Sequence, residues 1–122
     1  MGYTTEFSGR FVTDKPLPST LVSKLQKLAE DRHGGPCNVY DGYPGFWCQW
    51  VPSDDGMGIE WDGGEKFYSY DKWLQLIIDR YLTPAGISLS GKVLFRGEEI
   101  SDVGYLIAEA GRVRMQMLVP AE

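Results

Sequence analysis

The sequence is poor in the side chains that bind soft metals: it has one histidine, His33, and two cysteines, Cys37 and Cys48. A structural zinc site needs about four such ligands in paired spacing, so neither a metal nor another cofactor is expected. The chain also lacks an apolar run near the roughly 20 residues that cross a bilayer, and residues 1–15 lack the apolar segment of a secretory signal. We therefore expect a cytoplasmic protein, not bound to a membrane, with two free thiols.

Basic residues are outnumbered, with 12 Lys and Arg against 17 Asp and Glu and a net charge of −5. They are also scattered along the chain, whereas binding to a phosphate backbone relies on clustered Lys and Arg. Direct binding of nucleic acid is therefore not expected. The acidic balance fits a role in solubility, and it equally fits a protein that competes with nucleic acid for a basic surface.

Apolar and polar residues alternate over residues 3–13, which predicts a half-buried strand. Helical spacing then predicts a first helix, which ends before the glycines and proline at 34–36. Its apolar positions are Leu21, Val22, Leu25, Leu28 and Ala29. The density of glycine and proline from Gly34 to Gly45 predicts a surface loop.

A β-hairpin is predicted next, because residues that favour strands flank a strong turn signal. Its parts are a strand at 46–51, a turn at 53–56 and a returning strand at 58–62. Alternation places Phe46, Cys48 and Trp50 on one face of the first strand and Trp47, Gln49 and Val51 on the other.

Ser69 is the predicted N-cap of a second helix, with Asp71 in the favourable first turn. The apolar positions at helical spacing are Trp73, Leu74, Ile77, Ile78, Tyr81 and Leu82. Trp73, Ile77 and Tyr81 share one face and are expected to be buried. Three further strands follow, at residues 87–95, 105–109 and 112–119.

The elements follow the order βαββαβββ within a single domain, residues 1–122. Both helices are apolar on one side only, so each must cover a sheet. We expect an α+β fold, a two-layer sandwich of two helices on an antiparallel sheet of about five to six strands, broadly ferredoxin-like. The pattern leaves the strand order and the oligomeric state open.

Few residues have the chemistry of a catalytic centre. His33 lies at a predicted helix end, where a histidine more commonly binds the last carbonyl groups than acts in catalysis. Cys48 would need His33 nearby to act as a nucleophile, and a strand cysteine between tryptophans is more commonly part of the core. We therefore predict a protein that is not an enzyme.

Carboxylates gather on the predicted hairpin and its exit loop, at Asp54, Asp55, Glu60, Asp62 and Glu65. Paired carboxylates can bind a hard cation or transfer protons. The favoured interpretation is that these carboxylates are ordinary turn and surface residues, because Asp54 and Asp55 lie in a turn and the spacing of a calcium-binding loop is absent.

Aromatic residues are concentrated between Tyr40 and Trp73, a stretch that contains all four tryptophans. A hairpin has two faces and the core covers only one, so the core does not cover a side chain on the other face, such as Trp47. Two arrangements fit: Trp47 is exposed as a binding anchor, or the loop at 34–45 folds over it.

Two motifs carry a family resemblance: GFWCQWVP at residues 45–52 and IEWDGGEKFY at residues 59–68. Together with GYTTEF, DKPL, SGKV and the GE pair at 97–98, they resemble a family of small uncharacterised proteins of bacteria and their phages, notably actinobacterial phages. Those relatives carry a longer segment before the tryptophan motif. The resemblance implies no reaction, cofactor or catalytic residue, and it favours a phage or mobile-element origin.

Three functions fit the sequence. The first is a protein-binding module, phage-encoded and acting in the host cytoplasm, that blocks a basic surface on a host protein, such as a CRISPR effector of a defence system. The second is a small metal-dependent or nucleic-acid-processing enzyme that uses the hairpin carboxylates, and the third is an accessory phage protein of structural role. The predicted partner-binding residues are Trp47, Gln49, Asp54, Asp55, Glu60, Asp62, Glu65 and Tyr68.

Overall fold

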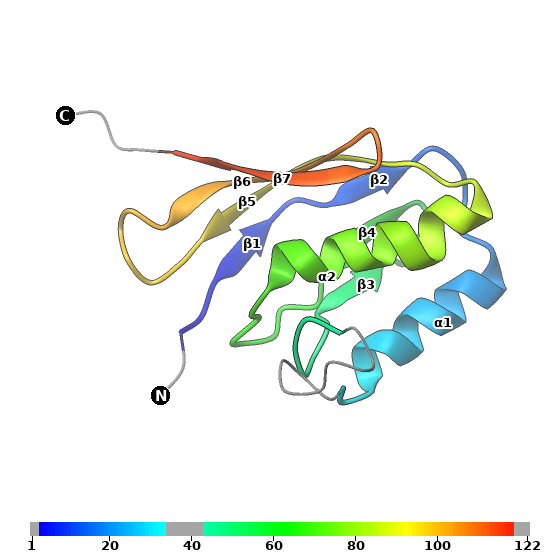
Figure 1. The fold of residues 1–122 in the computed structure, drawn as a ribbon, viewed down its shortest axis with the longest axis horizontal. Coiled ribbons are helices and arrows are strands. Elements are labelled where there is room, and N and C mark those ends of the chain that lie inside the picture. Colours follow the sequence, from blue (N-terminus) through cyan, green and yellow to red (C-terminus); the bar gives the residue numbers. More distant parts are fainter. Residues whose placement is uncertain (1–2, 34–42, 119–122) are drawn as a thin grey trace.

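Two helices pack on one face of an antiparallel sheet in the computed structural model, which describes residues 3–33 and 43–118 (Figure 1). The first half contains β1 (Glu6–Ser8), β2 (Phe11–Thr13), α1 (Ser19–Glu30), β3 (Trp50–Pro52) and β4 (Gly58–Trp61). The second half contains α2 (Tyr70–Ile77), a π-helical turn (Ile78–Leu82), a 3-10 turn (Thr83–Ala85), β5 (Leu89–Arg96), β6 (Val103–Glu109) and β7 (Arg112–Met117).

The sheet has the order β3-β4-β2-β5-β6-β7, and β1 pairs with β5 beside β2. The connection through α1 runs from β2 to β3 and leaves space for β4 between them. The connection through α2 runs from β4 to β5 and leaves space for β2. These interleaved crossovers are the split βαβ arrangement of ferredoxin-like folds, extended by the β6–β7 hairpin. The α+β sandwich predicted from sequence is confirmed.

The first predicted strand is broken into β1 and β2, which raises the strand number to seven. Gly9 interrupts it with a φ of +102°, and it lies near Val93 on the neighbouring strand. β1 and β2 pair with β5 in the same register, since Glu6 lies opposite Arg96 and Val12 lies opposite Ser90. A glycine in a strand commonly marks such a bend.

An aromatic cluster fills the space between the helices and the sheet. The Phe7 ring packs edge-on against Trp50 at 5.1 Å and against Tyr70 at 5.0 Å, and Phe67 packs on Trp50 at 5.3 Å. Such edge-to-face pairs add about 0.5–1.5 kcal/mol beyond burial alone. Most of the aromatic stretch seen in the sequence therefore builds the core.

Both helices cover the core with the residues that their spacing predicts. Leu21, Leu25 and Leu28 are buried on α1. Trp73 and Ile77, both in α2, are fully buried. Tyr81, in the π-helical turn that follows, is only half-buried. Ser69 occupies the N-cap position of α2 and Asp71 lies in the first turn, as predicted, but Ser69 has a φ of +55° and its side chain makes no capping hydrogen bond.

The predicted strand at 46–51 is wrong over its first four residues, because β3 begins at Trp50. A backbone group outside the sheet binds the start of this segment, because His33 N–H donates to the Phe46 carbonyl at 2.8 Å. The β3–β4 pairing resumes only at Gln49, whose carbonyl accepts the Asp62 N–H at 2.9 Å in the register of the ladder. Phe46 is consequently exposed and not on the buried side with Cys48. Residues 34–42 of the predicted loop lie outside the described residues.

Candidate functional site: an aromatic cleft beside the β3–β4 hairpin

A cleft of about 500 Å³ opens between the segment that precedes β3 and the segment that precedes α2. Its lining residues are Pro44, Gly45, Phe46, Trp47, Gln49, Glu65, Lys66, Tyr68 and Ser69. We call this feature the aromatic cleft. Three large aromatic side chains stand exposed around it: Phe46 by 41%, Trp47 by 48% and Tyr68 by 53%. Single surface aromatics need no explanation, but three exposed aromatics around one cleft make this cleft a candidate binding surface.

Contacts outside the cleft fix two of the three aromatic side chains. The Arg32 guanidinium lies over the Phe46 ring at 4.5 Å from its centre. The Tyr68 hydroxyl accepts a hydrogen bond from the Tyr3 backbone N–H at 3.1 Å. Trp47 makes no hydrogen bond or ring contact with any residue that the structure describes. Phe46 and Tyr68 are therefore held in place, while the Trp47 indole remains available to another molecule.

Gln49 joins the two walls of the cleft. Its amide Nε2 donates to the Glu65 carbonyl at 2.7 Å, and its Oε1 accepts from Trp61 Nε1 at 3.0 Å. Gln49 was predicted to bind a partner, but both ends of its amide are used within the protein. Its role in the structure is to position the segment that carries Glu65.

Two residues of the cleft have a backbone conformation that ordinary side chains seldom adopt. Lys66 has a φ of +59° and Ser69 a φ of +55°, and Ala110 in the β6–β7 turn is the other such non-glycine residue in the described chain. A left-handed non-glycine residue outside a hairpin turn costs about 1–3 kcal/mol and occurs preferentially at ligand-binding sites. This strain at the cleft supports a binding role for the segment from Glu65 to Ser69.

The structure separates the eight predicted site residues into two groups. Trp47, Gln49, Glu65 and Tyr68 all line the aromatic cleft. The others lie along the hairpin away from it: Glu60 is half-buried in β4, Asp62 closes the exit turn by accepting the Gly64 N–H at 2.7 Å, and Asp54 and Asp55 lie in the β3–β4 turn. Phe46, Lys66 and Ser69 were not predicted, because their placement depends on the irregular backbone on both sides of the cleft.

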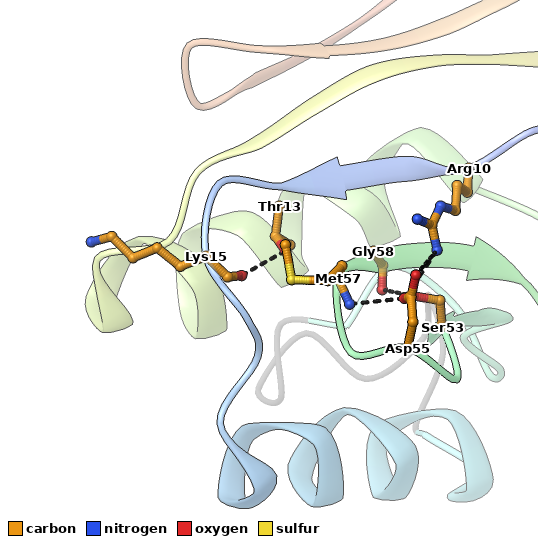
Figure 2. Close-up of polar contacts among 7 residues, drawn as sticks. All are labelled: Arg10, Thr13, Lys15, Ser53, Asp55, Met57 and Gly58. Carbon is orange, nitrogen blue, oxygen red and sulfur yellow. Dashed lines mark hydrogen bonds and ion pairs between the residues drawn. The ribbon is translucent and has the colours of Figure 1, made fainter.

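The Asp55 carboxylate contacts Arg10, Ser53 and Met57 (Figure 2), and Asp55 is not among the residues that line the cleft. Arg10 contacts both carboxylate oxygens, at 2.9 and 3.0 Å. Oδ1 also accepts the Ser53 hydroxyl at 2.7 Å and the Met57 N–H at 3.0 Å. The Ser53 hydrogen bond, the Met57 hydrogen bond and Arg10, in that order, lower the pKa of Asp55 from 3.8 to about 2.

We expect Asp55 to make the turn more stable above pH 4 than below it. A carboxyl group whose folded pKa is depressed contributes stability that is present above its unfolded pKa and is lost as the pH falls towards the folded pKa. The relevant window runs from 3.8 down to about 2. Urea unfolding should show Asp55→Asn less stable than the wild type at pH 6, with the difference shrinking as the pH falls through this window.

Asp54→Asn is the matched control, because the Asp54 side chain is exposed and makes no hydrogen bond to the described residues. It should follow the wild type at every pH. A constant difference between Asp55→Asn and the wild type from pH 6 to pH 2 would contradict the assignment.

The two nucleophilic or metal-binding side chains that the structure describes, His33 and Cys48, each have a place in the fold. The His33 ring nitrogen Nε2 contacts the Leu28 carbonyl of α1 at 2.9 Å, as expected of a histidine at a helix end. Cys48 is a free thiol exposed by only 1%, and burial raises its pKa to about 12. Within residues 3–33 and 43–118, no group of three or more His, Cys, Asp and Glu residues is placed to hold a metal ion. Cys37 lies outside the described residues.

Cys48 should therefore be unreactive in the folded protein, since the thiolate is the reactive form. In a Cys37→Ser background, treatment with iodoacetamide at pH 8 should leave the native protein unmodified and add one label after unfolding in urea. Rapid labelling of the native protein, measured by intact mass, would show that the thiol is accessible.

Comparison with known proteins gives no match: no family model, no curated protein and no solved structure is significantly similar to the chain. No helix in the described part of the chain has the length and apolar character needed to cross a membrane.

Proposed function

We propose that the protein is a binding module without catalytic activity, and that the aromatic cleft receives another protein. The observation that carries this proposal is the exposure of Phe46, Trp47 and Tyr68 around one cleft. Buried tryptophan and tyrosine anchors provide much of the energy of protein interfaces. Here the anchors are already presented by a fixed backbone, so little ordering remains when a partner binds.

The net charge of the chain favours a partner with a basic surface. At the cleft itself the charges are mixed, since Glu65 and Lys66 line it and the Arg32 guanidinium lies over the Phe46 ring. The whole chain carries a charge of −5, so its long-range field attracts cationic surfaces and repels anionic ones. With the phage resemblance, the proposal extends to a host protein that uses this basic surface to hold nucleic acid, such as a defence effector.

Affinity capture from a bacterial lysate tests the proposal with three baits. The baits are the wild type, Trp47→Ala and Ile100→Ala, and each variant removes one exposed apolar side chain. Ile100 is 91% exposed and lies away from the cleft. We expect a protein that is retained by wild type and by Ile100→Ala and lost with Trp47→Ala. Equal recovery of every protein on all three baits would contradict a role for the cleft.

A further inference from the structure

The two edges of the sheet differ in how they are protected against pairing with another strand. The β3 edge has three residues and ends in Pro52, which has no N–H to donate. The β7 edge has six residues, Arg112–Met117, and contains neither proline nor glycine. Proteins commonly protect an edge by keeping it short or by placing proline on it. The β7 edge lacks both features, although it carries two charged side chains, Arg112 and Arg114, which are a third means of protection.

The hydrogen-bond pattern shows which β7 groups point to the open edge. Leu118 donates to the Val103 carbonyl opposite it at 2.8 Å, so this is a bonded pair of the antiparallel ladder. Bonded pairs alternate along a ladder, and β7 pairs with β6 in a continuous register. The N–H and C=O groups of Val113, Met115 and Met117 consequently face away from β6.

One of these outward groups is already used. Gln75 on α2 accepts the Val113 N–H at 2.8 Å and donates to the Gly111 carbonyl at 2.9 Å, so its amide covers the start of the edge. The groups of Met115 and Met117 remain without such cover within the described chain. In Figure 1 this end of β7 extends past the first turn of α2. The Met115 and Met117 side chains are also 41% and 45% exposed.

We propose that this edge pairs with a second copy of the chain, antiparallel about a two-fold axis at Gln116. Met115 of each copy then lies opposite Met117 of the other, and their four N–H groups meet four carbonyl groups. Gln116 faces Gln116 of the partner subunit. Leu118 covers the stem of Arg114 on the opposite strand, because directly opposed side chains lie on one face. The surface is self-complementary, as a two-fold interface requires.

Charge and the Gln75 contact distinguish this register from its neighbours. A two-fold axis at Arg114 would oppose two arginines directly, which is destabilising. An axis at Met115 would pair Met117 with Val113, whose N–H is held by Gln75. Of the axes at Arg114, Met115 and Gln116, which the described residues define, the axis at Gln116 uses uncovered backbone groups and opposes no like charges. The choice of a second copy, and not an unrelated peptide, rests on this agreement.

Sedimentation velocity over about 5 to 500 µM tests the association, a range that suits a small interface. We expect a wild-type dimer at the high end, and a monomer throughout for Met115→Lys/Met117→Lys, because edge lysines oppose strand pairing. Val12→Lys is the control, since Val12 is 41% exposed on the inner strand β2. It should dimerise like wild type. A wild-type monomer at every concentration overturns the proposal, as does equal dimerisation of the double variant.

Cysteine trapping tests the register and does not depend on the fold of the lysine variant. Gln116→Cys, in a Cys37→Ser background, should form a disulfide dimer in air, because opposed residues of a non-bonded antiparallel pair lie about 4.5 Å apart at Cα. Arg114→Cys should not, since its partner in this register is Leu118. Cross-linking through Arg114→Cys alone would place the two-fold axis at residue 114 and overturn the proposed axis at Gln116. No cross-link with Gln116→Cys in a dimeric sample would place the interface elsewhere.

Discussion

Replacing Ile77 with alanine is expected to lower the free energy of unfolding by about 2–5 kcal/mol, the range for a well-packed core aliphatic. Ile77 is 0% exposed and belongs to the core cluster between α2 and the sheet. Its removal leaves a cavity whose walls include large, fixed side chains that cannot collapse to fill it. Equilibrium unfolding in urea, followed by circular dichroism, measures the change.

Ile100→Ala provides the matched control, because it makes the same chemical change at a side chain that is 91% exposed. Its free energy of unfolding should remain within about 0.5 kcal/mol of the wild type. If both variants unfold at the same urea concentration, α2 does not cover the sheet as described.

The parts of the fold that follow regular periodicity could be predicted from the sequence. The spacing of Leu21, Leu25 and Leu28 was sufficient for α1, because a one-sided apolar helix has only one way to bury its stripe. The Ala110-Gly111 turn between β6 and β7 was also placed correctly, and both residues have positive φ. Local chemistry determines these elements almost alone.

The path of the chain before β3 could not be predicted, because it depends on contacts between distant residues. The alternation at Phe46 to Trp50 is that of a strand, yet the Phe46 carbonyl binds His33 at the end of α1. A donor 13 positions earlier in the sequence leaves no trace in the local pattern. Tertiary context overrides strand propensity at such positions.

Four of the eight predicted site residues line the cleft, and the structure explains why the other four do not. Trp47, Glu65 and Tyr68 were chosen for an exposed aromatic beside carboxylates, and all three line the cleft. Asp55 was chosen for its charge alone, and its carboxylate already forms an ion pair with Arg10. The sequence shows that carboxylates are present but not which of them already have partners. The left-handed backbone at Lys66 likewise has no signature in residue type.

Glu65→Lys and Asp54→Lys separate the local field of the cleft from the net charge of the protein. Both reverse one exposed carboxylate, but only Glu65 lines the cleft. For the partner identified by capture, Glu65→Lys should lower the association rate constant more than Asp54→Lys does, and salt should reduce the difference. Asp62 is less suitable for this test, because its carboxylate holds the Gly64 N–H. Equal effects of the two reversals would assign the attraction to net charge.

Trp47→Ala should weaken binding to the same partner by about 2 kcal/mol or more, which corresponds to a roughly 30-fold higher Kd. Most of the change should appear in the dissociation rate constant, since the indole contacts the partner after encounter and carries no charge. The fold should be unaffected, because the side chain is 48% exposed and contacts no core ring. Surface plasmon resonance gives both rate constants, and urea unfolding checks the fold. If Trp47→Ala instead lowers stability as Ile77→Ala does, the indole belongs to the core and the cleft loses its anchor.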